Sequence, residues 1–160
     1  MKTGQLLPAL AASAALAWSA VAQPAAAQDG GFYLGILGGV YLEDSSSGVA
    51  ASKVVGFDLV TGNFVFGAEA ELMGMLWQGT QQYAALAARG RLGVMVTDEM
   101  LLYGTAGFYD WFHTSTYPAI GGGGEFMFND SLSGRVDIQG ILYGSETGVL
   151  ARGGFVWHPY

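Results

Sequence analysis

Residues 64–72 read Phe-Val-Phe-Gly-Ala-Glu-Ala-Glu-Leu, and every second residue from Phe64 to Leu72 is apolar. The charges of this stretch, Glu69 and Glu71, both fall between those apolar positions. Because successive side chains of a β-strand point to opposite faces, the stretch predicts a strand with one apolar and one charged face. The fold then depends on which of the two faces meets solvent.

The same period of two recurs along most of the chain after residue 30. Residues 86–96 place Leu86, Leu92 and Val94 on one face and Arg89 and Arg91 on the other. Glycine is frequent, with 26 residues, and no capping pattern precedes a helical stripe, so helices are not expected. We predict eight strands, over residues 32–42, 53–60, 64–76, 82–96, 100–112, 119–128, 132–143 and 147–157.

The composition excludes several classes of protein. Of the 160 residues, 51% are hydrophobic and only 12% are charged, and none is cysteine. This profile excludes a disulfide scaffold, a cysteine-based zinc site and a charged disordered chain, and it is unusual for a soluble enzyme. The net charge of −7 repels phosphates, so no nucleic acid partner is expected.

The charged faces have the character of an interior. A soluble sheet keeps its polar face wet with lysine and glutamate, but Lys53 is the only lysine beyond residue 2. Arginine is the cation suited to buried pairing with carboxylates. We therefore predict a network of charges inside the protein, formed by Asp58, Glu69, Glu71, Arg89, Arg91, Glu125, Arg135, Asp137 and Arg152.

A charged interior inside an apolar exterior is typical of a β-barrel in lipid. Eight strands form a barrel whose interior is just wide enough to be filled by side chains. We expect an all-β, eight-stranded, antiparallel, up-and-down transmembrane barrel, with outer-membrane lipid as its surroundings and no cofactor or metal. The lengths of the connections predict that the N-terminus of the barrel lies on the periplasmic side. The connections at 43–52, 77–81, 113–118 and 144–146, which would then lie outside, are mostly longer than those at 61–63, 97–99 and 129–130.

Aromatic residues near the strand ends are expected to form the two interfacial girdles of such a barrel. The residues assigned to these girdles are Tyr33, Tyr41, Trp77, Tyr103, Trp111, Tyr143 and Trp157.

The first residues are predicted to be a cleaved secretory signal peptide, residues 1–27, so that residues 28–160 form the barrel. Lys2 supplies the positive region, residues 6–22 are apolar, and Ala25 and Ala27 form an A-x-A cleavage signal. The protein is therefore expected outside the cytoplasm.

Short motifs that contain glycine lie at residues 63–71, 88–93 and 102–107. These motifs resemble the small opacity-type outer-membrane β-barrel proteins of Gram-negative bacteria, a group of OmpA-like eight-stranded barrels in the porin family of surface proteins. Residues 121–126 look like the next strand of that family. The chain departs from the family in its shorter loops and in its end, Trp157-His158-Pro159-Tyr160. The resemblance implies a Gram-negative outer-membrane location and a terminal aromatic signal for the barrel-assembly machinery. It does not identify a partner for the external loops.

Several functions are compatible with this fold. The first is a non-enzymatic structural or surface protein with a plugged lumen. His113 and Ser115, with Glu125, suggest an outer-membrane lipid A acyl hydrolase. The lumen charges suggest a narrow ion pore, and a secreted barrel that binds an apolar ligand is a fourth possibility. Residues 121–124, all glycine, lack the Lys-Ser/Thr of a phosphate loop and instead indicate a strand with little bulk.

Overall fold

A computed structural model describes residues 30–44, 46–79, 81–112 and 115–159 of the chain. The expected signal peptide lies outside these residues. The strands are β1 (Gly30–Glu43), β2 (Ser46–Thr61), β3 (Phe64–Trp77), β4 (Gln81–Thr97), β5 (Met100–Trp111), β6 (Thr116–Asn129), β7 (Leu132–Tyr143) and β8 (Glu146–Trp157).

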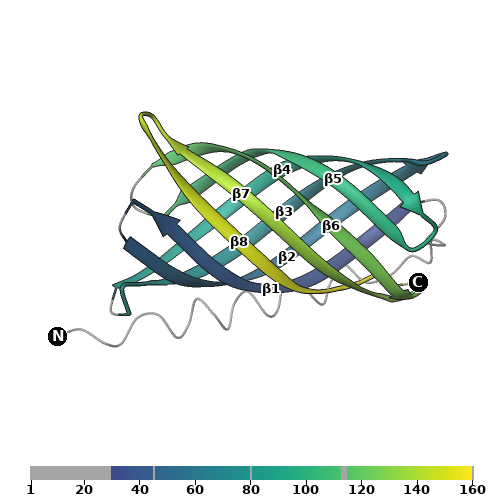
Figure 1. Ribbon diagram of the computed structural model, residues 1–160, viewed down its shortest axis with the longest axis horizontal. Helices are drawn as coiled ribbons and strands as arrows, with labels where there is room; N and C mark the ends of the chain where they lie inside the picture. The colour runs from purple at the N-terminus through teal and green to yellow at the C-terminus, as the bar shows by residue number, and fades with distance from the viewer. Residues whose placement is uncertain (1–29, 45, 80, 113–114, 160) are drawn as a thin grey trace.

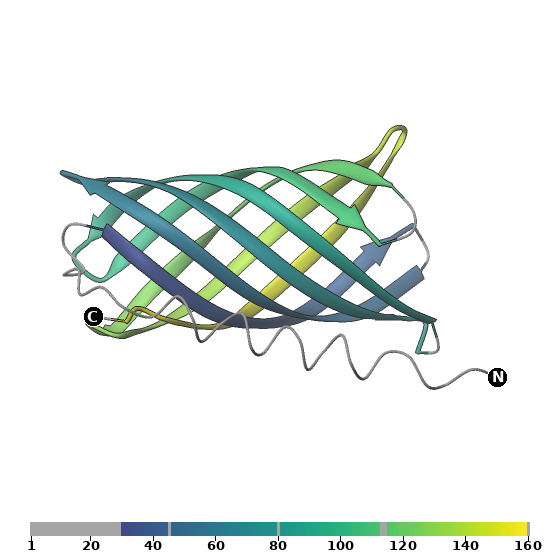
Figure 2. The ribbon, with the colours of Figure 1, turned by 180° about the vertical axis from the view of Figure 1, so that it is seen from behind.

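The eight strands form one closed barrel in which each strand pairs with its neighbours in sequence and β8 pairs with β1. All pairs are antiparallel, and the strands are tilted against the barrel axis (Figures 1 and 2). The predicted all-β, eight-stranded, antiparallel barrel is therefore confirmed. Among the described residues, no helix is long and apolar enough to cross a membrane.

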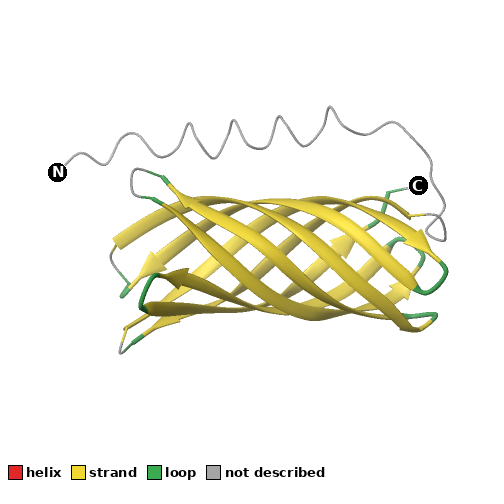
Figure 3. Cartoon of the chain, turned by 90° about the horizontal axis from the view of Figure 1, so that it is seen from above, coloured by secondary structure: helices red, strands yellow, loops and turns green. Residues whose placement is uncertain are grey.

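The turns lie at the two ends of the barrel (Figure 3). We call the end that holds Gly30 and Trp157 the terminal end, and the opposite end, which holds the β1–β2 turn, the distal end. The terminal end also carries the turns at 62–63, 98–99 and 130–131. The distal end carries the connections from β1 to β2, β3 to β4, β5 to β6 and β7 to β8.

The predicted long loop at 43–52 is wrong, because β2 begins at Ser46 and only residues 44–45 connect it to β1. Apart from Val49, residues 46–52 are serine, glycine or alanine, and such small residues give a weak strand signal. They pair nonetheless, with Gly48 opposite Tyr41 and Ser52 opposite Leu37. All distal connections have two to four residues and all terminal ones have two, so the expected asymmetry is slight.

The turns have the backbone that tight antiparallel connections require. Gly62, Gly79 and Gly144 have φ of 60°, 75° and 78°, and Asp44 and Gln78 have φ of 47° and 49°. Positive φ is typical of the primed turns that match the twist of paired strands. Four of the connections between strands therefore use the left-handed region, which glycine adopts without a steric penalty.

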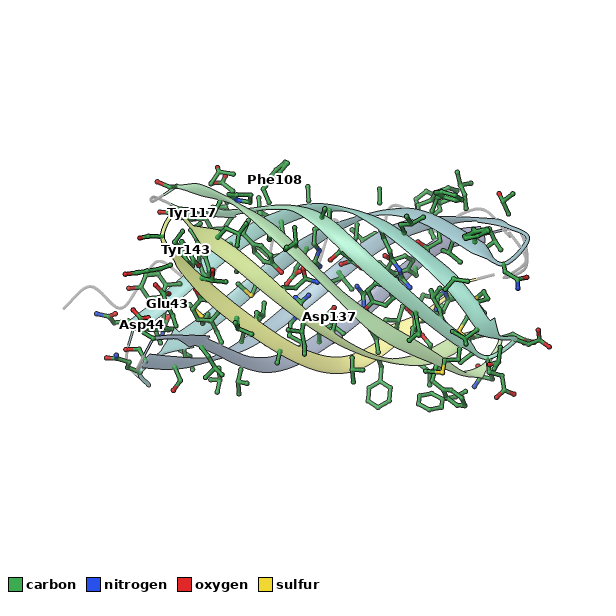
Figure 4. The ribbon with its side chains drawn as sticks, turned by 45° about the horizontal axis from the view of Figure 1, so that its top comes forward. Glu43, Asp44, Phe108, Tyr117, Asp137 and Tyr143 are labelled. Atoms are coloured by element: carbon green, nitrogen blue, oxygen red, sulfur yellow. The ribbon has the colours of Figure 1, made fainter. Side chains whose placement is uncertain are left out.

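Large apolar side chains cover the outside of the barrel, and the charged faces lie inside. In Figure 4, Phe108 points away from the barrel wall and Asp137 lies within it, and their exposures are 50% and 3%. Ile36, Val136 and Phe155 are also more than half exposed. The predicted alternation of apolar and charged faces is therefore confirmed.

The interior is not polar throughout. An apolar cluster fills the distal half of the lumen, where Met73, Met75, Ile141 and Leu150 pack against Trp111. A smaller cluster of Val65, Leu101 and Tyr103 lies toward the terminal end. The expectation of a polar lumen is corrected accordingly: charges occupy the middle and the terminal part, and apolar side chains close the distal part.

Candidate functional site

The nine charged residues predicted to face inward all lie inside the barrel. None is more than 8% exposed, and each contacts at least one residue of opposite charge. The strands position them because each occupies an inward position of the two-residue period. These residues are the candidate functional site.

Three arginines and three carboxylates form a closed ring of ion pairs, which we call the charge ring. Its carboxylates Glu69 and Glu71 are on β3, while Asp137 is on β7. Since β3 and β7 are four strands apart in the closed order, the ring crosses the lumen from wall to wall. In order around the ring the residues are Arg152, Glu71, Arg89, Glu69, Arg135 and Asp137, which returns to Arg152.

The contacts in the charge ring are direct. Arg89 Nη2 pairs with Glu69 and lies 2.5 Å from Glu71 Oε2, so one guanidinium joins two carboxylates. Arg152 holds Asp137 with two nitrogens, Nε at 2.9 Å and Nη2 at 3.2 Å. Such forked contacts fix orientation as well as charge. The ring is neutral, which favours its burial.

Tyrosine hydroxyls add hydrogen bonds to the charge ring. Tyr33 donates to Glu69 Oε2 at 2.8 Å, and Tyr109 donates to Glu71 Oε2 at 3.1 Å. Tyr103 accepts from Arg135 Nε at 2.6 Å. These partners were not predicted, although each tyrosine shares the inward parity of the charges on its own or a neighbouring strand.

A second group of charges, the terminal cluster, lies toward the terminal end. Arg91 Nη2 is 2.8 Å from Glu125 Oε2, and Arg91 Nη1 is 3.7 Å from Asp58. His158 Nε2 lies 3.0 Å from Glu125 Oε1, and Ser133 donates to the same oxygen at 2.6 Å. His158 was not predicted as a partner, because it follows the last strand and carries no two-residue pattern.

Four of the seven expected girdle aromatics lie inside the barrel, so their predicted place at the lipid interface is wrong. Tyr33, Tyr41, Tyr103 and Trp111 are 0%, 1%, 6% and 6% exposed. Their position near strand ends suggested an interface, but their parity along the strand places them on the inner face.

The other three expected aromatics differ from one another. Trp77 and Tyr143 are partly buried at the distal mouth, where they pack against the apolar cluster. The hydroxyl of Tyr143 is 2.7 Å from that of Tyr41, and Figure 4 shows Tyr143 and Tyr117 together at that end. Trp157 is 45% exposed and faces outward near the terminal end.

Phenylalanine supplies most of the outward aromatic rings near the terminal end. Phe32 and Phe57 lie 4.9 Å apart between ring centroids, and Phe128 and Phe155 lie 6.3 Å apart. Phe126 lies 5.8 Å from Phe128. The aromatic band therefore exists at this end, with residues other than most of those predicted.

Inward glycines make room for the buried tyrosines. A Cβ on Gly56 would lie 2.2 Å from Tyr33 Cζ, and one on Gly123 would lie 2.6 Å from the Tyr103 hydroxyl. Gly123 belongs to the glycine run of β6, and its neighbour Gly121 faces Gln139 in the same way. The expected role of that run as a strand with little bulk is confirmed.

The structure does not assemble the hydrolase suggested by the sequence. Ser115 directly precedes β6 at the distal end, whereas Glu125 lies ten residues along β6, about 30 Å away in an extended strand. His113 lies outside the described residues. Ser133 and His158 do meet, at 3.2 Å, but the same His158 nitrogen also contacts Glu125, and Ser133 is fully buried. A serine triad instead uses the two ring nitrogens for two different partners.

No protein-family model matches the chain, and no curated protein matches its sequence. Solved structures match its fold. The N-terminal β-barrel domain of Pseudomonas aeruginosa OprF has 11% identity and a TM-score of 0.57, over 80% of this chain and 98% of that one. The Yersinia pestis attachment invasion locus protein Ail has 11% identity and a TM-score of 0.54, over 80% and 96%. A de novo designed transmembrane β-barrel has 15% identity and a TM-score of 0.53, over 79% and 94%. The chain thus has the fold of eight-stranded outer-membrane barrels.

Proposed function

We propose that this protein is a non-enzymatic, integral barrel of the outer membrane of a Gram-negative bacterium, with a structural or surface role. The observation that carries the proposal is the apolar outer wall. Side chains such as Ile36, Phe66, Ile138 and Phe155 are 50–68% exposed and cover strands on every side of the barrel. Apolar patches on soluble monomers rarely exceed a few hundred Å². A continuous apolar wall with closed strand pairing is suited to hydrocarbon.

The interior argues against a soluble carrier of apolar ligands. Such a barrel needs an apolar internal cavity. In the described residues the middle of the lumen is occupied by the charge ring, and the distal part by packed apolar side chains.

The same packing argues against a pore. The charge ring joins opposite walls, and Arg135 and Glu71 within it are 2% exposed. A conducting path needs a continuous polar lumen, and the distal apolar cluster interrupts it.

The C-terminal strand is proposed to present the assembly signal. Phe155 and Trp157 are outward and exposed on β8, close to the terminal end. Recognition of this strand by the barrel-assembly machinery would use these aromatic side chains.

Migration of boiled and unboiled membrane fractions in gels tests the proposed function. A closed barrel resists detergent at room temperature, so the unboiled protein is expected to migrate differently from the boiled one. The protein is expected only in the membrane fraction, from which detergent extracts it. Equal migration, or recovery in the soluble fraction, would contradict the proposal.

For the hydrolase alternative, Ser115→Ala is expected to leave the mass profile of lipid A unchanged.

A further inference from the structure

One charged side chain stands within the apolar outer wall. Lys53 is exposed and outward on β2, between outward Ile36 on β1 and Leu72 on β3. On the described strands, the other charged outward residue is Asp110, one residue from the end of β5. Lys53 is therefore alone in the middle of the wall.

Its depth follows from the strand register. The outward apolar residues of β2 run from Val49 to Leu59, so Lys53 is four residues from the distal margin and six from the terminal margin. A strand tilted by about 40° rises roughly 2.5 Å per residue along the axis. The distances are therefore about 10 Å to the distal margin and about 15 Å to the terminal margin. An ammonium group held at that depth is strongly unfavourable in hydrocarbon.

The residues on the distal side of Lys53 leave room for its side chain. On that side the nearest outward residues are Gly38, Ala51 and Gly74, which pair with one another across three strands. A Cβ on Gly74 would meet nothing within 4 Å, and one on Gly38 only a backbone oxygen at 3.9 Å. We call these three residues the small row.

An extended lysine side chain spans about 6 Å. When the side chain lies over the small row, its ammonium comes within about 4 Å of the distal margin. A lipid phosphate at that margin is then close enough to contact the ammonium. On the terminal side the remaining gap is about 9 Å, and Leu34 and Val55 stand in the way.

We propose that Lys53 and the small row form a binding site for a phosphate-bearing anionic lipid of the leaflet at the distal end. The Lys53 side chain lies over the small row, and its ammonium pairs with the lipid phosphate. Phosphatidylcholine is disfavoured, because its choline cation repels the ammonium. This inference rests on the proposed membrane location. A second copy of the chain is a poorer occupant, because a two-fold axis along the membrane normal places Lys53 opposite Lys53, and Asp110 lies at another height.

The test reconstitutes the full chain in phosphatidylcholine vesicles, with and without added phosphatidylglycerol, and measures retained lipid by native mass spectrometry. Wild type is expected to retain phosphatidylglycerol in preference to phosphatidylcholine. Lys53→Gln removes the charge, and Gly74→Leu fills the small row while keeping the charge. Each variant is expected to reduce the preference for phosphatidylglycerol about tenfold, because losing one charged hydrogen bond has an effect of this size. Gly90→Leu, at an outward glycine with similar open space, is the matched control and is expected to retain the preference.

Folding in phosphatidylcholine alone, followed by gel migration, separates this inference from the proposed function. Failure of wild type to insert there overturns both. Insertion with equal retention of the two lipids, or with unchanged preference in Lys53→Gln, overturns the lipid site alone. Crosslinking through Lys53 to a second copy or to another protein, in place of retained lipid, also overturns it.

Discussion

At the scale of single residues, stability depends on arginines that each hold more than one carboxylate. Arg89 joins Glu69 and Glu71, and its Nη1 donates to Tyr109 at 2.7 Å. Its removal leaves two buried carboxylates with fewer partners, and an uncompensated buried charge is expensive.

Arg89→Ala is therefore expected to lower the free energy of unfolding by about 3–5 kcal/mol. Urea titration of the barrel in vesicles, followed by tryptophan fluorescence, measures this change. Glu99→Gln, in an exposed turn, is the control and is expected to stay within about 0.5 kcal/mol of wild type. Equal stability of Arg89→Ala and the control would show that the charge ring does not stabilise the fold.

Tyr33→Phe tests a neutral partner of the same ring. It removes the hydroxyl that donates to Glu69 and leaves the aromatic ring in place. The expected loss is about 1.5–3 kcal/mol, since the acceptor is charged, and it should be smaller than that of Arg89→Ala. The same titration ranks the two, and the reverse order would contradict the contacts described here.

The charges and the tyrosines differ in how far they could be predicted. Arginine and glutamate on one face of a strand have few explanations other than pairing, so Arg89 and Glu69 could be placed inside from parity alone. Tyrosine suits both an interface and a buried hydrogen bond. For Tyr33 and Tyr103, position near a strand end suggested the interface, whereas parity indicated the interior.

At the scale of elements, neighbouring strands fit together because glycine faces tyrosine across the inner wall. Gly56 lies opposite Tyr33 on β1, and Gly48 lies opposite Tyr41. The Tyr33 ring occupies the volume that Gly56 leaves free, and the Tyr41 ring occupies the volume that Gly148 on β8 leaves free. Strand pairing and interior packing therefore depend on the same residues.

Gly56→Ala is expected to destabilise the barrel by about 1–3 kcal/mol, because its methyl group would overlap the Tyr33 ring. Gly74→Ala is the matched control, since it adds the same group to a strand where nothing lies within 4 Å. The control is expected to be neutral or stabilising by about 0.5–1 kcal/mol. Similar losses in the two variants, measured by urea titration, would contradict the inward packing of Gly56.

The strands themselves were predictable wherever large residues alternate with polar ones. Most predicted bounds lie within three residues of those observed. The exception is β2, which begins at Ser46 instead of at residue 53. Its first residues contribute little side-chain area, so their pairing is set by β1 and β3 on either side and not by their own preference.

At the scale of the whole molecule, the barrel is closed at both its wall and its lumen. The register of eight strands seals the wall, and the charge ring and the apolar cluster of Met73 and Leu150 fill the lumen. Closure of the wall could be predicted from the number and length of the strands in the sequence. The apolar distal plug did not, because inward Met, Ala and Leu have the same appearance in sequence as outward ones.

The filled lumen predicts that the protein does not conduct ions. Planar bilayers containing the purified barrel are expected to show no steps in current over the empty bilayer. A protein-free detergent sample is the control. Stepwise conductance that disappears in a variant of the charge ring, such as Asp137→Asn, would instead identify the ring as part of a pore.

The proposed membrane location requires that the apolar wall faces lipid. The chain has no cysteine, so single nitroxide labels can be attached at Ile138→Cys, in the middle of the wall, and at Asp98→Cys, in a terminal turn. In vesicles, electron paramagnetic resonance is expected to show the label at 138 relaxed strongly by oxygen and weakly by a water-soluble nickel chelate, with the opposite order at 98. Strong relaxation of the label at 138 by the nickel chelate would mean that this wall faces water, and would contradict the proposed membrane location.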